Sequence, residues 1–532
     1  MNEAREAALI QAGLQAGLFD GETLAKSRPL ARSRRAGLLE TLAAECALPQ
    51  TAFYLALAET RGLPYAHPAR WPLEEALSAK LPLTLLKRCP MAVLRSPEGV
   101  PHLALSNPDD SLGAESARRL LGIMPLALIE PEGLSILLMR LCGKEAVEGA
   151  ESLDPVRLFE RIAREALLRR ASDIHIEAGK EGARVRLRVD GRLEVFGAPL
   201  ARELGEALIS RVKVLSGMDI SETRAPQDGG LAYPAGEGEP IEIRAASAPV
   251  KFGERLTLRV MKSDPGRQKL DSLGLRPDIT ARLRKALSHP HGIVLVTGPT
   301  GGGKSTTLYC ALRELDASRL NILTVEDPVE QMIPGVSQVQ VSSKVSFSAA
   351  LRSFLRHDPD VILVGEIRDL DTADTALKAA ATGHMVLSTL HTNSAPGAVT
   401  RLTDIGCERF MLGATLRGIL AQRLVRMLCP HCRRPREANA EEKERLGAQK
   451  NGAPLMLYAP SGCPRCLDSG YCGRIGLYEA LWIDEAVAQA IVSGADERAI
   501  AAAARDYWRL ADDAREKVLA GITSFEEAEA FL

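Results

Sequence analysis

The sequence predicts a multidomain α/β protein with a mostly parallel sheet in its central domain, for three reasons. The chain has 532 residues, more than one hydrophobic core usually supports. A glycine-rich stretch from Gly298 to Ser305 follows a short apolar run and precedes a segment of helical composition. Apolar runs then alternate with helical stretches along the chain, which is the order expected of an α/β sheet.

The composition is that of an ordinary globular protein, with 46% hydrophobic and 25% charged residues. Only 4% of residues are aromatic, which disfavours a nucleic-acid surface built on base stacking. The formal net charge of -1 gives no general attraction to DNA or membranes. The sequence shows neither a membrane-spanning apolar run nor a signal-peptide core. We therefore expect a cytoplasmic protein, in which closely spaced cysteines indicate metal ligands before disulfides.

Residues 1–145 are predicted to form a first domain of mixed structure. Apolar residues at helical spacing run from Leu24 to Leu63, and a strand over Val100–Leu105 precedes a helix over Leu112–Leu121. A basic cluster in this region consists of Arg28, Arg32, Arg34 and Arg35. It is either a solvated helix face or a docking surface for an acidic partner, a lipid head group or a nucleotide.

A linker is expected at residues 146–155, which are small, acidic and poor in helix formers. Residues 156–264 then predict an α+β domain, because an amphipathic helix from Val156 leads into strand-like alternation with a hairpin signal at Asp190-Gly191. This domain carries arginines at turns and strand ends: Arg211, Arg224, Arg244, Arg255 and Arg259. A single arginine of this kind is usually structural, whereas several facing a neighbouring phosphate site would act on it.

Residues 265–428 are predicted to form the third domain, with strands at the apolar runs 293–296, 322–325, 361–364 and 385–389. Its glycine-rich stretch has the spacing of a P-loop, which fits better than an incidental glycine turn because a strand precedes it and a helix follows. Converging backbone N–H groups and the helix N-terminus would hold a nucleoside triphosphate. Lys304 would reach the β- and γ-phosphates, and the Ser305 hydroxyl would ligate Mg²⁺. The predicted nucleotide-binding residues are Gly298, Pro299, Thr300, Gly301, Gly302, Gly303, Lys304, Ser305 and Thr306.

Acidic and histidine residues follow the later strands of this domain. Glu330 ends an acidic stretch after the second apolar run, Glu366 follows the third, and His384 and His391 flank the fourth. An isolated acid after a strand is usually a helix cap or a solvated residue. Several such residues in the order of a P-loop enzyme instead predict hydrolysis, which needs carboxylates to orient and deprotonate water.

Two CxxC pairs, Cys429/Cys432 and Cys463/Cys466, predict a metal site in a module of residues 429–472. Four thiolates from two knuckles form the closed tetrahedral set of structural zinc. Iron–sulfur ligation is the alternative, which the proline inside each pair and the lack of redox context disfavour. Cys472 is predicted to be a spare thiol. Residues 473–532 are expected to form a helical C-terminal region.

The four motifs of the third domain resemble, in content and order, those of the GspE/PulE/PilB family of type II secretion and type IV pilus assembly ATPases. That family carries a Walker A loop, an acidic box, a Walker B strand ending in Gly-Glu and a two-histidine box. Ala171–Glu177 and Arg224–Gly229 also resemble its second N-terminal domain. The resemblance extends from about Pro155 to the C-terminal tail.

This resemblance implies a RecA-like ATPase domain preceded by a PAS-like α+β domain, with ATP as the nucleotide. Glu330 would position the attacking water, and Glu366 would act with Mg²⁺. His384 and His391 would couple the nucleotide to the sheet. The arginines expected to approach the γ-phosphate are Arg211, Arg224 and Arg244. A tetracysteine zinc module is typical of the assembly motors of the family and is generally missing from its retraction motors.

The chain departs from the family pattern at three positions. Gly302 stands where serine is usual, and Gly230 follows Asp228-Gly229 where arginine is common. His357 precedes Asp358 where glutamine is usual. The second departure removes one candidate phosphate contact, but none removes a motif residue needed for hydrolysis.

The resemblance also implies a homo-hexameric motor that powers pilus or pseudopilus assembly while peripherally attached to the inner membrane. Residues 1–145 would be an adaptor for the cytoplasmic domain of an inner-membrane platform protein. Arg35-Ala36-Gly37 resembles a cyclic di-GMP module of some relatives, although its spacing departs from that module. The alternatives from other classes are a P-loop motor for nucleic-acid transfer, for which charge and aromatic content give little support, and a scaffold that binds ATP without hydrolysing it.

Overall fold

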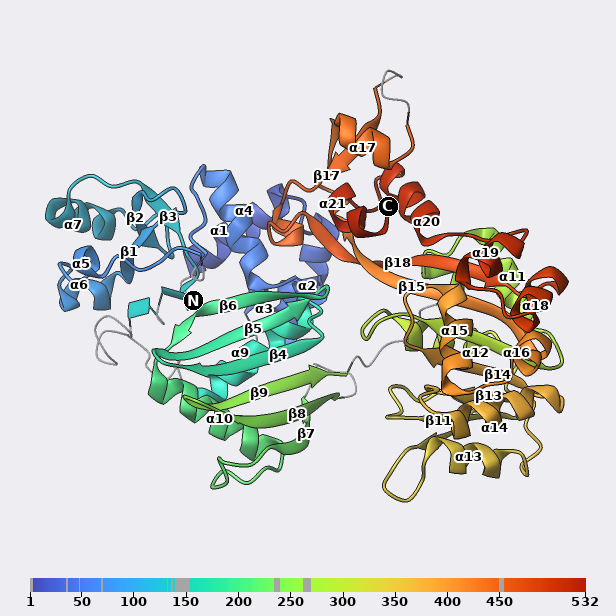
Figure 1. The fold of residues 1–532 in the computed structure, drawn as a ribbon. Helices are drawn as coiled ribbons and strands as arrows, with labels where there is room; N and C mark the ends of the chain where they lie inside the picture. The colour runs from blue at the N-terminus through green and yellow to red at the C-terminus, as the bar shows by residue number, and fades with distance from the viewer. Residues whose placement is uncertain are drawn as a thin grey trace. The chain divides into compact units, whose positions relative to one another are not determined.

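The computed structural model describes residues 3–34, 37–46, 48–67, 70–131, 133–134, 137–138, 154–233, 240–261, 269–448 and 454–532. The chain divides into two compact units, which are described here separately. The first comprises Met1–Ser263 with Ser461–Gly470, and the second Asp264–Pro460 with Tyr471–Leu532 (Figure 1). Residues 35–36 and all but the last two residues of the predicted linker lie outside the described ranges.

The first unit begins with four helices: α1 (Glu3–Gln15), α2 (Gly21–Arg34), α3 (Leu38–Glu45) and α4 (Gln50–Arg61). The last three cover the stretch in which the apolar spacing predicts helices, whereas α1 precedes it. Leu9, Leu42 and Phe53 are fully or almost fully buried in their shared core. Helix α4 ends at Arg61 and is capped by Gly62, whose φ of 62° is the left-handed conformation that glycine adopts readily.

A small α/β segment follows in the same unit. Its elements are α5 (Glu75–Ser78), α6 (Leu83–Arg88), β1 (Met91–Arg95), β2 (Pro101–Leu105), α7 (Ser111–Leu121) and β3 (Leu126–Leu128). The three strands form one sheet in the order β1-β2-β3, with β1 antiparallel and β3 parallel to the central β2. The predicted strand and helix of this region are thereby confirmed as β2 and α7.

The α+β part of the first unit is a six-stranded antiparallel sheet with two helices. Its elements are α9 (Pro155–Leu168), β4 (Asp173–Gly179), β5 (Gly182–Val189), β6 (Arg192–Leu200), α10 (Arg202–Leu215), β7 (Gln227–Tyr233), β8 (Ile241–Val250) and β9 (Gly253–Val260). The strand order is β6-β5-β4-β9-β8-β7, and α9 and α10 cover one face. The predicted hairpin is confirmed, since Val189 pairs with Arg192 and Asp190 and Gly191 both have positive φ.

The second unit is built on a seven-stranded sheet in the order β12-β11-β13-β14-β10-β15-β18. Its strands are β10 (Gly292–Thr297), β11 (Ile322–Glu326), β12 (Ser337–Gln340), β13 (Val361–Val364), β14 (Met385–Leu390), β15 (Leu416–Leu428) and β18 (Tyr471–Trp482). All neighbours pair in parallel except β15 and β18. The four predicted strands are confirmed as β10, β11, β13 and β14.

Both faces of this sheet are covered by helices, so its strands are apolar throughout. Ile293 and Leu295 of β10 enter one core, and Val294 and Val296 enter the other. Helix α11 (Pro277–Leu287) precedes β10, and the helices between the strands are α12 (Lys304–Arg313), α13 (Phe347–Phe354), α14 (Leu370–Ala381), α15 (Ala395–Ile405) and α16 (Arg409–Thr415).

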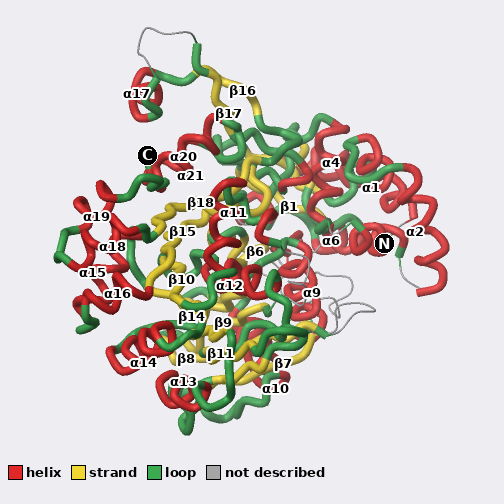
Figure 2. Tube along the Cα trace, turned by 90° about the vertical axis from the view of Figure 1, so that its right-hand side faces the viewer, coloured by secondary structure: helices red, strands yellow, loops and turns green. Residues whose placement is uncertain are grey.

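The chain after β15 forms a small antiparallel pair and then returns to the sheet. The remaining elements are β16 (Arg434–Glu437), α17 (Ala440–Arg445), β17 (Met456–Ala459), α18 (Glu485–Val492), α19 (Glu497–Ala503), α20 (Leu510–Leu519), α21 (Phe525–Ala528) and the short 3₁₀ helices η3 (Leu270–Ser272), η4 (Pro464–Cys466) and η5 (Glu529–Phe531). The region predicted as helical from residue 473 therefore begins with most of strand β18 and becomes helical at Glu485 (Figure 2). The buried run Leu477–Leu481 carries no periodicity that separates a central strand from a buried helix.

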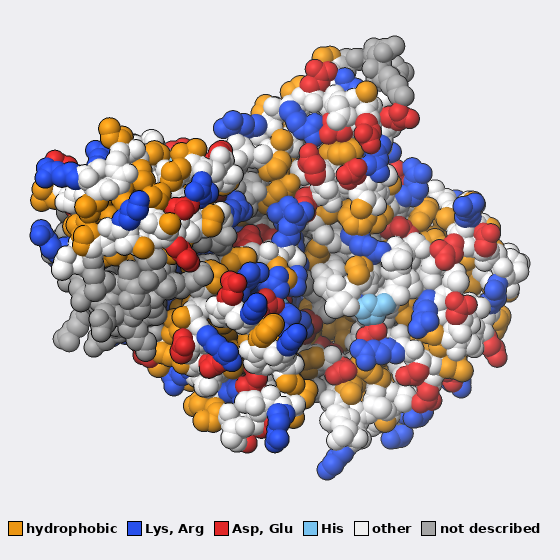
Figure 3. Space-filling view, turned by 60° about the vertical axis from the view of Figure 1, so that its left-hand side comes forward, with side chains coloured by type: hydrophobic (Ala, Val, Ile, Leu, Met, Phe, Trp, Pro, Cys, Tyr) orange, Lys and Arg blue, Asp and Glu red, His pale blue; other side chains and the backbone are white. Residues whose placement is uncertain are grey.

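Acidic and basic side chains are interspersed on the face shown in Figure 3, in keeping with the balanced charge of the sequence. Within the described ranges, every helix is too short or too polar to cross a bilayer.

Candidate active site

The glycine-rich stretch connects the end of β10 to the start of α12. Gly301 and Gly303 have φ values of 74° and 85°, which residues with a Cβ rarely adopt. Gly298 also has a positive φ, and a Cβ there would lie 2.4 Å from the backbone oxygen of Gln422 in the neighbouring β15. The loop thus needs glycine both for its backbone conformation and for its close approach to the adjacent strand.

Lys304 is the first residue of α12 and is largely buried within the loop. Its Nζ donates hydrogen bonds to the backbone oxygens of Gly298 and Pro299, at 2.8 and 3.0 Å. Burial lowers the pKa of Lys304, and the carboxylate of Glu366 acts in the opposite direction. The ammonium group is therefore held at the centre of the loop, where phosphate oxygens would meet it.

The acidic stretch after β11 places a carboxylate beside the P-loop. The Ser305 hydroxyl donates to Oε1 of Glu330 at 3.4 Å, a long hydrogen bond. Glu326, which ends β11, is buried and accepts a hydrogen bond from Thr324 at 2.6 Å. The two glutamates thus differ in environment, because Glu330 is solvent-exposed and Glu326 belongs to the interior.

Glu366 lies just beyond the end of β13, with a partner on each carboxylate oxygen. Nε2 of His391 is 3.2 Å from Oε1, and Nε of Arg368 donates to Oε2 at 2.9 Å. The loop that carries His391 is itself tied to the P-loop strand, because the backbone N–H of Thr392 donates to Oγ1 of Thr297 at 2.9 Å. The structure therefore links Glu366, the histidine loop and the base of the P-loop.

These groups line one pocket of about 270 Å³ in the second unit. Its polar lining comes from the P-loop and from the carboxyl ends of β11, β13 and β14: Thr300, Lys304, Ser305, Tyr309, Glu326, Asp327, Glu330, Glu366, Arg368, Thr389 and His391. Ligands of open α/β sheets bind outside the carboxyl ends of the strands, which is where this pocket lies. The pocket thus brings a lysine cation and a serine hydroxyl together with carboxylates, as phosphate binding and water activation require.

Five polar lining residues were not among the predicted site residues: Tyr309, Glu326, Asp327, Arg368 and Thr389. Arg368 and Asp327 lie near predicted motif residues in the sequence, so their charge and position could have identified them as lining residues. The sequence gives no such indication for Tyr309, because a tyrosine five residues into a helix is usually a core residue.

The structure does not place His384 in this pocket. His384 precedes β14 and His391 follows it, so the length of the strand, roughly 20 Å, lies between them. The Nδ1 of His384 instead lies 2.8 Å from the backbone oxygen of Ala379. Of the two predicted histidines, only His391 lies with the P-loop and the carboxylates.

The three predicted arginines belong to the first unit and do not form one cluster there. Arg211 lies on α10 with its Nε buried and without a hydrogen-bond partner. Arg224 lies in the loop after α10 with 91% of its side chain exposed. Arg244 lies on β8 between Ile243 and Ala245, which face the core. It therefore projects from the opposite sheet face to that covered by α10.

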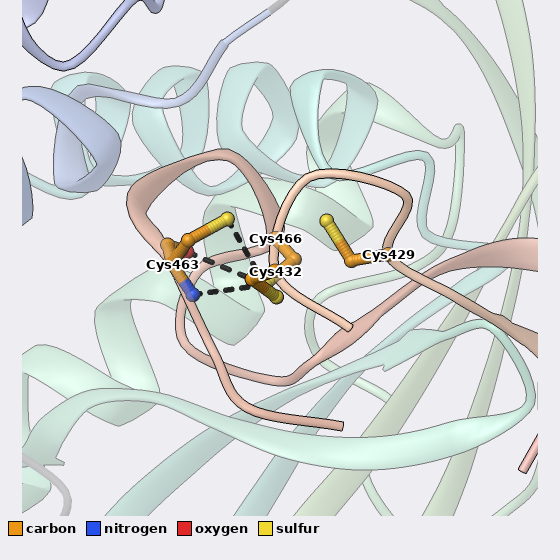
Figure 4. Close-up of side chains that lie close together, drawn as sticks. All are labelled: Cys429, Cys432, Cys463 and Cys466. Carbon is orange, nitrogen blue, oxygen red and sulfur yellow. Dashed lines mark hydrogen bonds between the residues drawn. The ribbon is translucent and has the colours of Figure 1, made fainter. Parts of the chain in front are cut away.

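The four predicted cysteine ligands lie together, with their sulfur atoms within 4.8 Å of one another (Figure 4). The sulfurs of Cys463 and Cys466 are 3.7 Å apart. A tetrahedral zinc ion with Zn–S distances of about 2.3 Å sets its ligands about 3.8 Å apart. Sγ of Cys466 also accepts backbone N–H bonds from Cys463 and Gly470, both at 3.2 Å. These residues fit a structural zinc site, and Cys472 is not part of the cluster.

Comparison with known proteins agrees with this geometry. A family model described as "Type II/IV secretion system protein" matches residues 149–530. The type II secretion system ATPase E of Vibrio cholerae is 46% identical over 387 residues, which are 72% of this chain and 76% of that protein. The type II secretion system protein E of Dickeya dadantii is also 46% identical, with the same coverage. The solved Legionella pneumophila ATPase DotB has a TM-score of 0.53 at 25% identity and covers 71% of this chain and 95% of that chain.

The fold and the pocket define a P-loop ATPase, an ATP-hydrolysing enzyme of the secretion and pilus motor class. The family match spans more than half of the chain, and the identities exceed 40% over about three quarters of the relatives' length. The chain belongs to the GspE/PulE/PilB family of type II secretion and type IV pilus assembly ATPases.

Proposed function

We propose that this chain is the motor of a type II secretion system, in which ATP hydrolysis drives assembly of a pseudopilus. The observation that carries the proposal is the convergence of Lys304, Ser305, Glu330 and Glu366 on one pocket at the carboxyl end of a parallel sheet. The relatives, which are named as type II secretion proteins, favour secretion over a type IV pilus.

The pocket suggests a separate role for each group. Lys304 and the backbone N–H groups of the P-loop grip the phosphates. Ser305 and Glu366 are the oxygen donors that would hold Mg²⁺, which when bound neutralises charge on the phosphates. Glu330 orients the attacking water and accepts its proton. His391 and Arg368 hold Glu366 in place through its two carboxylate oxygens.

Arginines of the first unit complete the site in this proposal. Arg211, Arg224 and Arg244 are the candidates for offsetting the charge that develops on the γ-phosphate. The chain would act as a homo-hexamer in which the arginines of one subunit serve the P-loop of another. Residues 156–264 would then be the PAS-like domain that closes over nucleotide.

The cysteine cluster would hold zinc as a structural ion. Cys429, Cys432, Cys463 and Cys466 supply four thiolates and leave no open position for substrate. The ion would crosslink two chain segments that are far apart in sequence. Its contribution is to the stability of the module formed by residues 429–472.

Residues 1–145 would attach the motor to the membrane platform. We propose that this region binds the cytoplasmic domain of an inner-membrane protein, so that the motor is cytoplasmic and only peripherally attached to the membrane. Arg35 and Ala36 of the cyclic di-GMP-like stretch lie outside the described residues, and that ligand stays a secondary hypothesis.

Deletion of the gene in the source cell tests the proposed function. Secreted enzymes should disappear from the medium while surface pili persist, and the wild-type gene should restore secretion. A gene encoding Glu366→Gln should not restore it, although the protein accumulates normally. Loss of pili with intact secretion would contradict the assignment to type II secretion.

A further inference from the structure

A buried tyrosine connects the P-loop helix to the loop that carries Glu330. Tyr309 lies on α12 and is almost fully buried. Its hydroxyl donates a hydrogen bond to Oε2 of Glu326. The same hydroxyl accepts a hydrogen bond from the backbone N–H of Glu330 at 3.2 Å. One phenolic oxygen therefore joins the end of β11 to the backbone of the proposed water-orienting residue.

The partners of Glu326 fix the direction of this hydrogen-bond chain. Its carboxylate accepts from the Thr324 hydroxyl at 2.6 Å and from Nε2 of Gln338 at 3.1 Å, besides Tyr309. All three neighbours donate to carboxylate oxygens of Glu326. Burial raises the pKa of Tyr309, and the hydroxyl keeps its proton for this bond. Its lone pairs are then left to accept from the Glu330 N–H.

Gln338 of β12 holds the other side of the same loop. Its Nε2 also donates to the backbone oxygen of Gln331 at 2.9 Å, and its Oε1 accepts from the backbone N–H of Ile333 at 2.7 Å. The loop after β11 is therefore held at three backbone groups, by Tyr309 at residue 330 and by Gln338 at residues 331 and 333. The side chain of Glu330 is solvent-exposed, whereas its backbone N–H is held by the hydrogen bond to Tyr309.

We propose that Tyr309 is a positioning residue for ATP hydrolysis, which holds Glu330 at the phosphate site through its hydrogen bonds to Glu326 and to the Glu330 backbone. The inference rests on the proposed role of Glu330. A carboxylate that orients water must be placed within a few tenths of an ångström, and a displacement of 1 Å can cost about a hundredfold in rate. The tyrosine supplies that placement from the helix that begins at Lys304, so the P-loop and the acidic loop form one rigid frame.

Tyr309→Phe tests the proposal in the full-length protein, because it keeps the ring and removes both hydrogen bonds. We expect kcat for ATP hydrolysis to fall by about 10- to 100-fold, with KM and ATP affinity changed by less than about threefold. Tyr471→Phe is the matched control, since the Tyr471 hydroxyl shares a hydrogen bond of 2.9 Å with the hydroxyl of Ser524 and Tyr471 does not line the pocket. It should keep wild-type turnover.

Glu330→Gln and the double variant Tyr309→Phe/Glu330→Gln separate this inference from the proposed function. If Tyr309 acts through Glu330, the double variant should be no slower than Glu330→Gln alone. Wild-type turnover of Glu330→Gln would overturn the role of Glu330 itself. Two results would overturn only the positioning role of Tyr309. One is slow hydrolysis by Glu330→Gln together with full turnover of Tyr309→Phe. The other is additive losses of turnover in the double variant.

Glu326→Gln gives a second test of the positioning role that leaves Tyr309 in place. This variant is the deciding test if Tyr309→Phe does not fold. An amide can accept at only one of the two oxygen positions. Either Tyr309, which donates to Oε2, or both Thr324 and Gln338, which donate to Oε1, then lose their acceptor. We expect the same loss of kcat with little change in KM. Wild-type kcat in Glu326→Gln would contradict the proposal.

Discussion

His391 and Glu366 face each other across the carboxyl ends of two neighbouring parallel strands, with Nε2 of the histidine 3.2 Å from Oε1 of the glutamate. Arg368 binds the other carboxylate oxygen. The glutamate that follows β13 is therefore fixed by one residue from its own loop and one from the next strand. Because the His391 loop is also bonded to Thr297 at the base of the P-loop, these contacts connect the carboxyl ends of β10, β13 and β14.

Replacing His391 should therefore impair hydrolysis more than replacing His384. His391→Ala leaves Glu366 bound to Arg368 alone, and we expect kcat to fall at least about tenfold through misplacement of the carboxylate. His384→Ala is the matched control at the other end of β14, and its effect on kcat should be several-fold smaller. Equal losses of kcat in the two variants, measured by steady-state ATP hydrolysis, would show that the contact with Glu366 does not explain the effect of replacing His391.

One of the three arginines should be required for turnover but not for ATP binding. We expect Ala at Arg211, Arg224 or Arg244 to lower kcat by on the order of a thousandfold at the position that meets the γ-phosphate.

Mixing that variant with Lys304→Ala subunits tests whether the arginine acts across a subunit boundary. Activity should reappear in the mixture, because some interfaces then pair an intact P-loop with an intact arginine. A mixture that stays inactive while subunits exchange excludes the between-subunit arrangement, and full turnover in all three Ala variants excludes the arginine role.

The purified protein should contain about one zinc ion per chain, as four thiolates in one tetrahedral site require. Cys429→Ser or Cys466→Ser should lose the metal and lower the thermal stability of that module, while ATP still binds at the P-loop. Cys472→Ser is the matched control and should keep the zinc. Elemental analysis that finds iron, or no metal in protein purified under reducing conditions, would refute the zinc assignment.

The segment formed by β16, α17 and β17 should lose stability in acid because of one buried glutamate, Glu442 on α17. Hydrogen bonds from Arg436, at 2.7 and 2.5 Å, lower the pKa of Glu442 from its usual value of 4.5. The folded state thus favours the ionised carboxylate more than the unfolded state does. Its stabilisation is complete above about pH 4.5 and is lost as the pH falls through the lowered pKa.

Amide hydrogen exchange in residues 434–437 and 456–459 measures this effect. At pH 7, Glu442→Gln should lower the free energy of local opening by about 1–3 kcal/mol. The difference from wild type should shrink as the pH falls below about 4.5 and through the lowered pKa of Glu442. Glu437→Gln, which removes the ion pair of an exposed carboxylate with Lys443, should have little effect at either pH. A Glu442→Gln difference that does not depend on pH would contradict the role of ionisation.

The elements that hold the phosphates could be predicted because their signals are local. A central parallel strand is apolar along its whole length, as in Ile293–Val296, and the positive φ angles of the P-loop require glycine. The four cysteines could likewise be predicted from the spacing within each pair. Each of these features depends on residues that are close together in the sequence.

Features that depend on contacts between distant segments could not be predicted. Strand β18 was assigned partly to the metal module and partly to a helical region, because only its pairing with β15 makes it a strand. The positions of His384 and His391 at opposite ends of one strand follow from the sheet, whereas the sequence shows only two histidines seven residues apart. Tyr309 is indistinguishable from a core residue until the loop after β11 is folded over it.

The most direct test of the account is ATP binding and hydrolysis by Glu366→Gln beside Lys304→Ala and wild type. Glu366 is needed in the transition state, so Glu366→Gln should bind ATP with near-wild-type affinity and hydrolyse it at least about a hundredfold more slowly. Lys304→Ala should lose ATP affinity itself, because it removes the cation at the centre of the P-loop. Wild-type hydrolysis by Glu366→Gln, measured as phosphate release at saturating ATP and Mg²⁺, would contradict the assignment of this pocket as the active site.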